Sequence, residues 1–116
     1  MLRCGTARID VTPPEEMLAE GKVYTIGFWY RRVLPMLSVR EPLSVRCIHL
    51  DDGGLQVAVV GWESLGDNCG VLHKVERMMA GAGMRDVKLF IACTHSHATP
   101  DTLDLCDTPL PEEYLD

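Results

Sequence analysis

Apolar and polar residues alternate along some stretches of this 116-residue chain and gather into apolar runs along others. Residues 7–12 alternate as a half-buried strand does, and the proline pair that follows ends this strand because proline lacks the N–H that continues a ladder. Two more strand-like stretches, 44–50 and 55–61, flank the turn Asp51-Asp-Gly-Gly54, whose glycines allow the positive φ of a tight turn. These stretches therefore predict a β-hairpin.

A helical spacing follows the hairpin. Asp67 and Asn68 can cap a helix, and Gly81 and Gly83 can end it. Between them apolar residues recur every three or four positions, as on the buried face of an amphipathic helix: Val71, Leu72, Val75, Met78 and Met79. We therefore predict a helix over 68–80 whose apolar stripe belongs to the core.

The apolar run 87–93 is typical of a strand that is buried on both faces. Together with the strand 55–61 and the helix 68–80 it gives the order strand, helix, strand. Such a β-α-β unit has parallel strands and a right-handed crossover. The predicted fold class is therefore α/β, with a mixed sheet that contains a β-hairpin and a β-α-β unit.

Two segments lack these patterns. Residues 15–42 are interrupted by glycines and prolines, and we predict a long surface loop there with a short helical turn at 15–20. Within it, the aromatic and basic residues 28–32 either serve a function or pin the loop to the body of the protein. Residues 104–116 are acidic, contain two prolines and predict a loop or tail with little to anchor it.

Charge and composition exclude some classes of protein. The length suits one small domain, and the net charge of −6, with no basic cluster longer than Arg31-Arg32, argues against nucleic-acid binding. No apolar run approaches the roughly 18 residues of a transmembrane helix. We see no apolar signal region at residues 1–5, and the five scattered cysteines form no C-x-x-C pair, so we expect free thiols and a cytoplasmic location.

The candidate chemistry lies where the run 87–93 ends, at Thr94, His95, Ser96 and His97. Ligands bind at the carboxyl ends of strands in open α/β sheets, and side chains two residues apart on an extended chain point the same way. We therefore expect His95 and His97 to address one bound species. Imidazole is a good zinc ligand, zinc activates a bound water, and a second histidine nearby can carry a proton.

Other readings of this pair stay open. A catalytic zinc usually has three protein ligands, so a zinc site here needs at least one ligand besides the two histidines. Cys93 has the same parity along the strand as both histidines, and His49 and Glu63 are further candidates, although no spacing commits them. The two histidines could instead only cap the end of a strand. A barrel-type amidohydrolase fits poorly, because its His-x-His pair ends the first strand and at least three strands precede this pair.

Four segments of the chain together carry a likeness to a known family: Gly5-Thr-Ala-Arg-Ile-Asp-Val-Thr-Pro-Pro14, Glu41-Pro-Leu-Ser-Val-Arg-Cys47, Val57-Ala-Val-Val-Gly-Trp-Glu-Ser-Leu-Gly66 and Ala92-Cys-Thr-His-Ser-His-Ala-Thr-Pro100. In this order they resemble the amino-terminal part of the neutral/alkaline non-lysosomal ceramidase family. They are similar to that family's Asp-Ile-Thr-Pro-Pro strand, its Asp-Pro-Leu-x-x-Arg-Ala stretch, its apolar strand ending in Asp-Leu, and its Ala-x-Thr-His-x-His-x-x-Pro motif. Glu63 stands where the family usually has Asp, which indicates a divergent homologue.

The resemblance implies an incomplete portion of a larger α/β zinc hydrolase domain, with 1–103 as its amino-terminal segment and 104–116 as a loop or tail. It also implies a zinc-dependent ceramidase, an amidohydrolase that cleaves the amide bond of N-acyl sphingoid lipids such as ceramide, or of a related amide. On the family pattern His95 is a zinc ligand, and His97 is a catalytic residue beside it that contacts the substrate. The remaining zinc ligands, a His, a Glu and a Tyr, come from later in family chains, which are often secreted.

This chain carries one of the zinc ligands that the resemblance implies. We therefore expect 1–116 to be a single partial domain that is inactive alone and that self-associates or is complemented by a carboxyl-terminal portion. Open sheet edges in so short a chain also favour association. The alternative is a non-catalytic or partner-dependent module that retains the fold but lacks the full metal site.

Overall fold

A computed structural model describes residues 1–26, 33–67, 70–105 and 109–115 of the chain. The predictions for the aromatic and basic residues 28–32, for the cap at Asn68, and for the thiols of Cys69 and Cys106 lie outside the described residues. Three cysteines within them, Cys4, Cys47 and Cys93, are free thiols, as expected.

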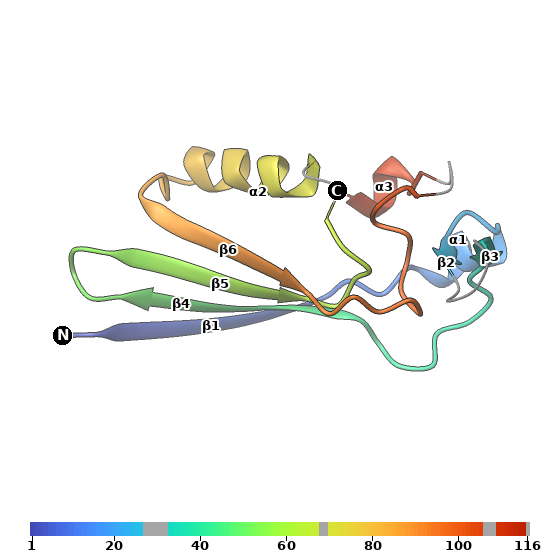
Figure 1. Ribbon diagram of the computed structural model, residues 1–116, viewed down its shortest axis with the longest axis horizontal. Coiled ribbons are helices and arrows are strands. Elements are labelled where there is room, and N and C mark those ends of the chain that lie inside the picture. The colour runs from blue at the N-terminus through green and yellow to red at the C-terminus, as the bar shows by residue number, and fades with distance from the viewer. Residues whose placement is uncertain (27–32, 68–69, 106–108, 116) are drawn as a thin grey trace.

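Four strands form the main sheet in the order β1-β4-β5-β6 (Figure 1). The first two pairings are antiparallel and the pairing of β5 with β6 is parallel, which confirms the predicted mixed sheet, hairpin and β-α-β unit. The strands are β1 (Arg3–Asp10), β4 (Ser44–Asp51), β5 (Gln56–Trp62) and β6 (Val87–Cys93).

The hairpin turn between β4 and β5 is held by two aspartates. Asp51 accepts a hydrogen bond from the Gly53 N–H at 2.7 Å, and Asp52 accepts bonds from the N–H groups of Gly54 and Leu55 at 2.8 Å each. The bonds from Leu55 and Gly54 lower the pKa of the Asp52 carboxyl. Gly53 has φ of 96°, a conformation that glycine adopts at little cost. The turn chemistry read from the sequence is the chemistry that closes this hairpin.

The helix α2 (Gly70–Gly81) connects β5 to β6 and lies over one face of the sheet (Figure 1). The prediction that its apolar stripe belongs to the core is wrong: no residue of α2 is buried, and Met78 is 63% exposed. Val71 and Val75 instead line a cavity between the helix and the sheet. Among the described residues no helix has the length and apolar character needed to cross a membrane.

The strand β6 is not buried on both faces, contrary to the prediction. Its exposure alternates along the strand, with Lys88, Phe90 and Ala92 exposed and the residues between them half-buried. The reason is that α2 covers only one face of the sheet. On the other face Phe90 pairs in register with Val59, which pairs with Ile48, and all three apolar side chains are exposed.

The segment 15–42 is more structured than the predicted long loop, although the short helical turn at its start is confirmed. Its elements are α1 (Glu15–Ala19), β2 (Tyr24–Ile26) and β3 (Val33–Pro35), of which the two strands form a separate antiparallel pair. Leu18, Val23 and Met36 form a small buried cluster among them. This small unit lies beyond the carboxyl end of β6 (Figure 1).

Within the acidic segment 104–116, the described residues 109–115 are anchored, although the sequence predicts little to hold them. It contains the short helix α3 (Glu112–Leu115), and the Tyr114 hydroxyl donates a hydrogen bond to the Val11 carbonyl oxygen at 2.6 Å. Burial raises the pKa of Tyr114 to about 12. Tyr114 therefore ties the end of the described chain to the residue that follows β1.

Candidate functional site

The chain segments that leave β5 and β6 run side by side at the carboxyl end of the sheet. The Thr94 N–H donates to the Trp62 carbonyl oxygen at 3.0 Å, and the Ser96 N–H donates to the Ser64 carbonyl oxygen at 3.2 Å. The parallel pairing of the strands thus continues into their exit loops. Because both loops are tied together by backbone bonds, the residues after β6 have a defined position.

His95 leaves the extended conformation that the sequence predicts for it. Its φ is 57°, in the left-handed region that non-glycine residues adopt only at a cost of about 1–3 kcal/mol. Its Nδ1 lies 2.8 Å from the Leu65 carbonyl oxygen, and its side chain is exposed. Backbone strain of this kind clusters at functional sites, where the surrounding structure holds it in place.

His97 is held from a different part of the chain. Its Nδ1 lies 3.0 Å from the carbonyl oxygen of Ile26, the last residue of β2. The rings of His95 and His97 nevertheless meet, with centroids 5.2 Å apart and planes at 88°. The structure therefore brings the two predicted site residues together, although by a bend at His95 and not by the alternation of an extended strand.

The hydrogen bonds of the two rings define their tautomer. A carbonyl oxygen only accepts, so each Nδ1 must carry the hydrogen and donate it. In a neutral ring with hydrogen on Nδ1, the lone pair is on Nε2. Metal-ligating histidines are commonly oriented in this way, with the second nitrogen donating to a backbone carbonyl. The pair can thus offer imidazole nitrogen to a cation or accept a proton.

Several of the most completely buried residues that the structure describes belong to these loops. Leu65, whose carbonyl oxygen holds His95, is 1% exposed, and Asp101, four residues after His97, is also 1% exposed. Asp101 accepts hydrogen bonds from the N–H groups of Leu103 and Leu105, both at 3.1 Å, and so orders the turn that follows. The loops that carry the histidines are therefore tightly packed.

Sequence reasoning missed the residues that position the pair. Leu65 and Ile26 hold the two histidine rings through their backbone carbonyl oxygens. A carbonyl oxygen cannot be recognised from a pattern of side chains in the sequence. Asp101 could have been found, because an aspartate directly after a proline is a common organiser of turns.

Glu63, a candidate ligand, joins β4 to the end of β5 instead. Its Oε2 accepts hydrogen bonds from the Ser44 N–H at 2.5 Å and the Ser44 hydroxyl at 2.9 Å, while Arg46 lies 3.6 Å from Oε1. These contacts, with the Ser44 hydroxyl first, lower the pKa of the Glu63 carboxyl. The carboxylate therefore serves to hold two strands in register.

Replacing Glu63 by Gln is expected to lower the free energy of unfolding at neutral pH by about 1 kcal/mol, since hydrogen bonds to a charged acceptor are lost. The folded-state pKa is depressed, so the contribution is present above the unfolded pKa and is lost as pH falls through the folded one. Urea unfolding from pH 7 to pH 3 should thus show a shallower loss in Glu63→Gln than in the native chain. Glu41→Gln, at an exposed position, is the control; equal acid sensitivity of native and Glu63→Gln proteins would contradict this role.

The other candidate ligands lie apart from the pair or make other contacts. His49 is on β4, where its Nε2 is 3.2 Å from the Gln56 side-chain oxygen. Cys93 is half-buried at the end of β6 and pairs in register with Trp62. Within the described ranges, no three side chains of His, Cys, Asp or Glu gather closely enough to hold a metal ion.

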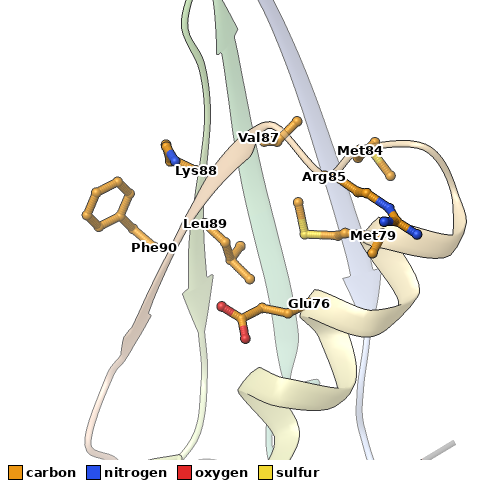
Figure 2. A pocket seen from close by; sticks show the side chains of 9 residues that line it. Glu76, Met79, Met84, Arg85, Val87, Lys88, Leu89 and Phe90 are labelled. Carbon is orange, nitrogen blue, oxygen red and sulfur yellow. The ribbon is translucent and has the colours of Figure 1, made fainter.

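A separate hollow of about 490 Å³ lies at the start of β6, whereas the histidine pair follows the end of that strand. Figure 2 shows Leu89 and Met79 between β6 and α2, with Glu76 and Arg85 near them, while Phe90 projects away from the helix. This hollow is therefore separate from the candidate chemistry.

Comparisons with known proteins bear on the fold. No protein-family model and no curated protein sequence matches the chain. Neutral ceramidase from Pseudomonas aeruginosa matches in structure with a TM-score of 0.77 and 15% identity, over 98% of this chain and 19% of that one. A ceramidase complexed with C2 matches with a TM-score of 0.75 and 15% identity, over 98% of this chain and 18% of that one.

The chain thus spans about a fifth of the length of the solved structures it matches. At this identity the likeness establishes the fold. The predicted resemblance is confirmed at that level: the chain has the architecture of a segment of neutral ceramidase.

Proposed function

We propose that the chain is a segment of a ceramidase-like zinc-dependent amidohydrolase, which cleaves the amide bond of N-acyl sphingoid lipids or a related amide. The observation that carries this proposal is the meeting of His95 and His97 at the carboxyl end of the sheet, each ring held through Nδ1 by a backbone carbonyl. The fold shared with neutral ceramidase supports the choice of substrate class.

The residues present fit a zinc site in part. We assign His95 as the zinc ligand, because donation from Nδ1 to Leu65 leaves the lone pair on Nε2, and because a strained backbone holds the ring in an exposed position. Zinc, when bound, supplies Lewis acidity and an activated water. The remaining ligands would come from polypeptide outside this chain.

We assign His97 as the catalytic residue that contacts the substrate. The Ile26 carbonyl oxygen fixes its ring beside that of His95, so His97 can hold or move a proton at Nε2 near the reacting amide. The small unit that contains β2 therefore positions the catalytic ring from the outside. General acid–base groups of this kind typically contribute roughly 100-fold to 10,000-fold to a rate.

The proposal predicts activity in a completed protein and little in the chain alone. A chimera in which this chain replaces the matching fifth of Pseudomonas aeruginosa neutral ceramidase should hydrolyse a fluorescent N-acyl sphingosine. His97→Ala should lower kcat/KM in that chimera by roughly 100-fold or more. His73→Ala, on the exposed surface of α2 where the ring contacts Glu76, should have no effect.

Robust turnover by the chain alone would contradict the need for further polypeptide. A chimera that folds, as judged by circular dichroism and gel filtration, yet hydrolyses no amide would contradict the amidase proposal. That result would favour a non-catalytic or partner-dependent module that retains the fold.

A further inference from the structure

Thr102 lies where the loop after β6 meets the loop after β5, and it is 5% exposed. Its hydroxyl donates a hydrogen bond to the Gly66 carbonyl oxygen at 2.6 Å. The same hydroxyl oxygen accepts a hydrogen bond from the Gly66 N–H at 3.3 Å. Thr102 therefore holds both backbone polar groups of Gly66. We propose that Thr102 is a positioning residue for His95, and that it acts through the peptide group that joins Leu65 to Gly66.

A single peptide group links Thr102 to the histidine. The carbonyl oxygen of Leu65 and the N–H of Gly66 belong to the same planar unit. The oxygen accepts the hydrogen bond from His95 Nδ1 at 2.8 Å, and the N–H donates to Thr102. Because the unit is rigid, a side chain that fixes its N–H also fixes the direction of its oxygen. Hydrogen bonds in such a chain polarise one another, so the bond at Gly66 also makes the Leu65 oxygen a better acceptor.

Leu103 packs against the same peptide group. A Cβ on Gly66 would meet the Leu103 side chain at 2.8 Å, so that side chain lies directly on the glycine backbone. The Leu103 N–H in turn donates to the buried carboxylate of Asp101 at 3.1 Å. Two adjacent residues of one ordered turn thus contact Gly66, Thr102 by hydrogen bonds and Leu103 by packing.

The backbone of His95 is held separately from its ring. The hydrogen bonds donated by the N–H groups of Thr94 and Ser96, on either side of it, fix the backbone. The orientation of the ring depends on the contact of Nδ1 with the Leu65 oxygen. Removal of the Thr102 hydroxyl should therefore disturb the ring while the backbone bonds beside His95 remain.

The value of this arrangement for zinc binding rests on the proposed function, whereas the hold on the ring rests on the contacts themselves. With hydrogen on Nδ1, the lone pair of His95 is on Nε2, the nitrogen that a metal would take. Partners that orient a ligating histidine typically change metal affinity 10-fold to 100-fold. Thr102 orients that partner, the Leu65 oxygen, and not the ring directly.

The test compares Thr102→Val with Thr102→Ser in the chain labelled with ¹⁵N-histidine. Valine keeps the shape of the side chain and removes the hydroxyl, whereas serine retains the hydroxyl. The two ring nitrogen signals of His95, assigned by their absence in His95→Asn, report which nitrogen carries the hydrogen. Thr102→Val should shift His95 from the Nδ1–H tautomer toward the Nε2–H tautomer. It should also speed exchange of the Gly66 amide hydrogen by about tenfold, the effect of losing one hydrogen bond. Thr102→Ser should behave as the native chain does.

The matched control is Thr99→Val, which removes another buried hydroxyl from the same loop. Thr99 is 2% exposed, and its hydroxyl donates to the Ser96 carbonyl oxygen at 2.8 Å. This variant should leave the His95 tautomer and the Gly66 exchange rate unchanged. Thr102→Ala removes the same hydroxyl and replaces Thr102→Val if that variant does not fold.

An unchanged His95 tautomer in folded Thr102→Val protein, or an equal change in Thr99→Val, would overturn the proposal. The proposed function can fail independently. A tautomer shift in Thr102→Val, together with a chimera that binds no zinc, would support the positioning role and remove the zinc assignment.

Discussion

Replacing Leu65 by Ala is expected to lower the free energy of unfolding by about 2–5 kcal/mol, as for other large-to-small changes at buried leucines. The Leu65 side chain is 1% exposed, so its loss leaves a cavity in the packed loop beside His95. The same residue holds the ring of His95 through its carbonyl oxygen. The substitution should therefore loosen that ring as well as destabilise the fold, which urea unfolding and the imidazole NMR signals of His95 can measure.

The control for this change is Leu37→Ala. Leu37 is 83% exposed, and its truncation should change the free energy of unfolding by less than about 0.5 kcal/mol. Equal stability of the two variants would show that Leu65 is not packed as the structure describes. A stability loss without any change in the His95 signals would show that the packing of the Leu65 side chain does not control the position of that ring.

Replacing His95 by Ala is expected to weaken zinc binding on the order of 100-fold or more, because loss of an outer-shell partner alone typically costs 10-fold to 100-fold. The affinity can be compared between the chimera with Pseudomonas aeruginosa neutral ceramidase and its His95→Ala variant, by competition with a zinc-binding dye. The matched control is His73→Ala, which removes an exposed imidazole from α2. Zinc retained equally by native and His95→Ala proteins would exclude His95 as a ligand.

A second substitution at position 95 separates the role of the imidazole ring from the effect of the backbone conformation. Asparagine adopts the left-handed conformation more readily than alanine does, and His95 has φ of 57°. His95→Asn should therefore lose zinc affinity as His95→Ala does while retaining more of the stability. If both variants were equally unstable, the strain at His95 would have no measurable part in the fold.

The sequence was most informative where local chemistry decides the structure. The turn Asp51-Asp-Gly-Gly54 contains the side chains and glycines that close it, so the hairpin could be predicted from a few adjacent residues. The β-α-β unit could also be predicted, because the pattern of apolar residues and the order of the elements leave few topologies. The sequence also placed two histidines directly after β6, and the structure brings their rings together.

Features that depend on distant parts of the chain could not be predicted. The apolar run of β6 indicates burial, but burial requires a layer on each side, and among the described elements α2 covers one face only. The meeting of the histidine rings depends on a carbonyl of Ile26, which is 71 residues from His97 in the sequence. The sequence shows which side chains are available to a site. It does not show which backbone carbonyl oxygens from distant segments will accept their hydrogen bonds, because that depends on the fold.

The pairing of β1 with β4 has a consequence for synthesis on the ribosome. The hairpin partners Asp51 and Gln56 are close in sequence, whereas the contact between Arg3 and Asp51 spans 48 residues. Closing the longer loop costs more entropy, so β4 and β5 should pair before β1 joins them. At about 5–20 residues per second, β1 waits several seconds after its own synthesis until β4 has been translated. During that interval its backbone amides are exposed to other nascent chains and to chaperones.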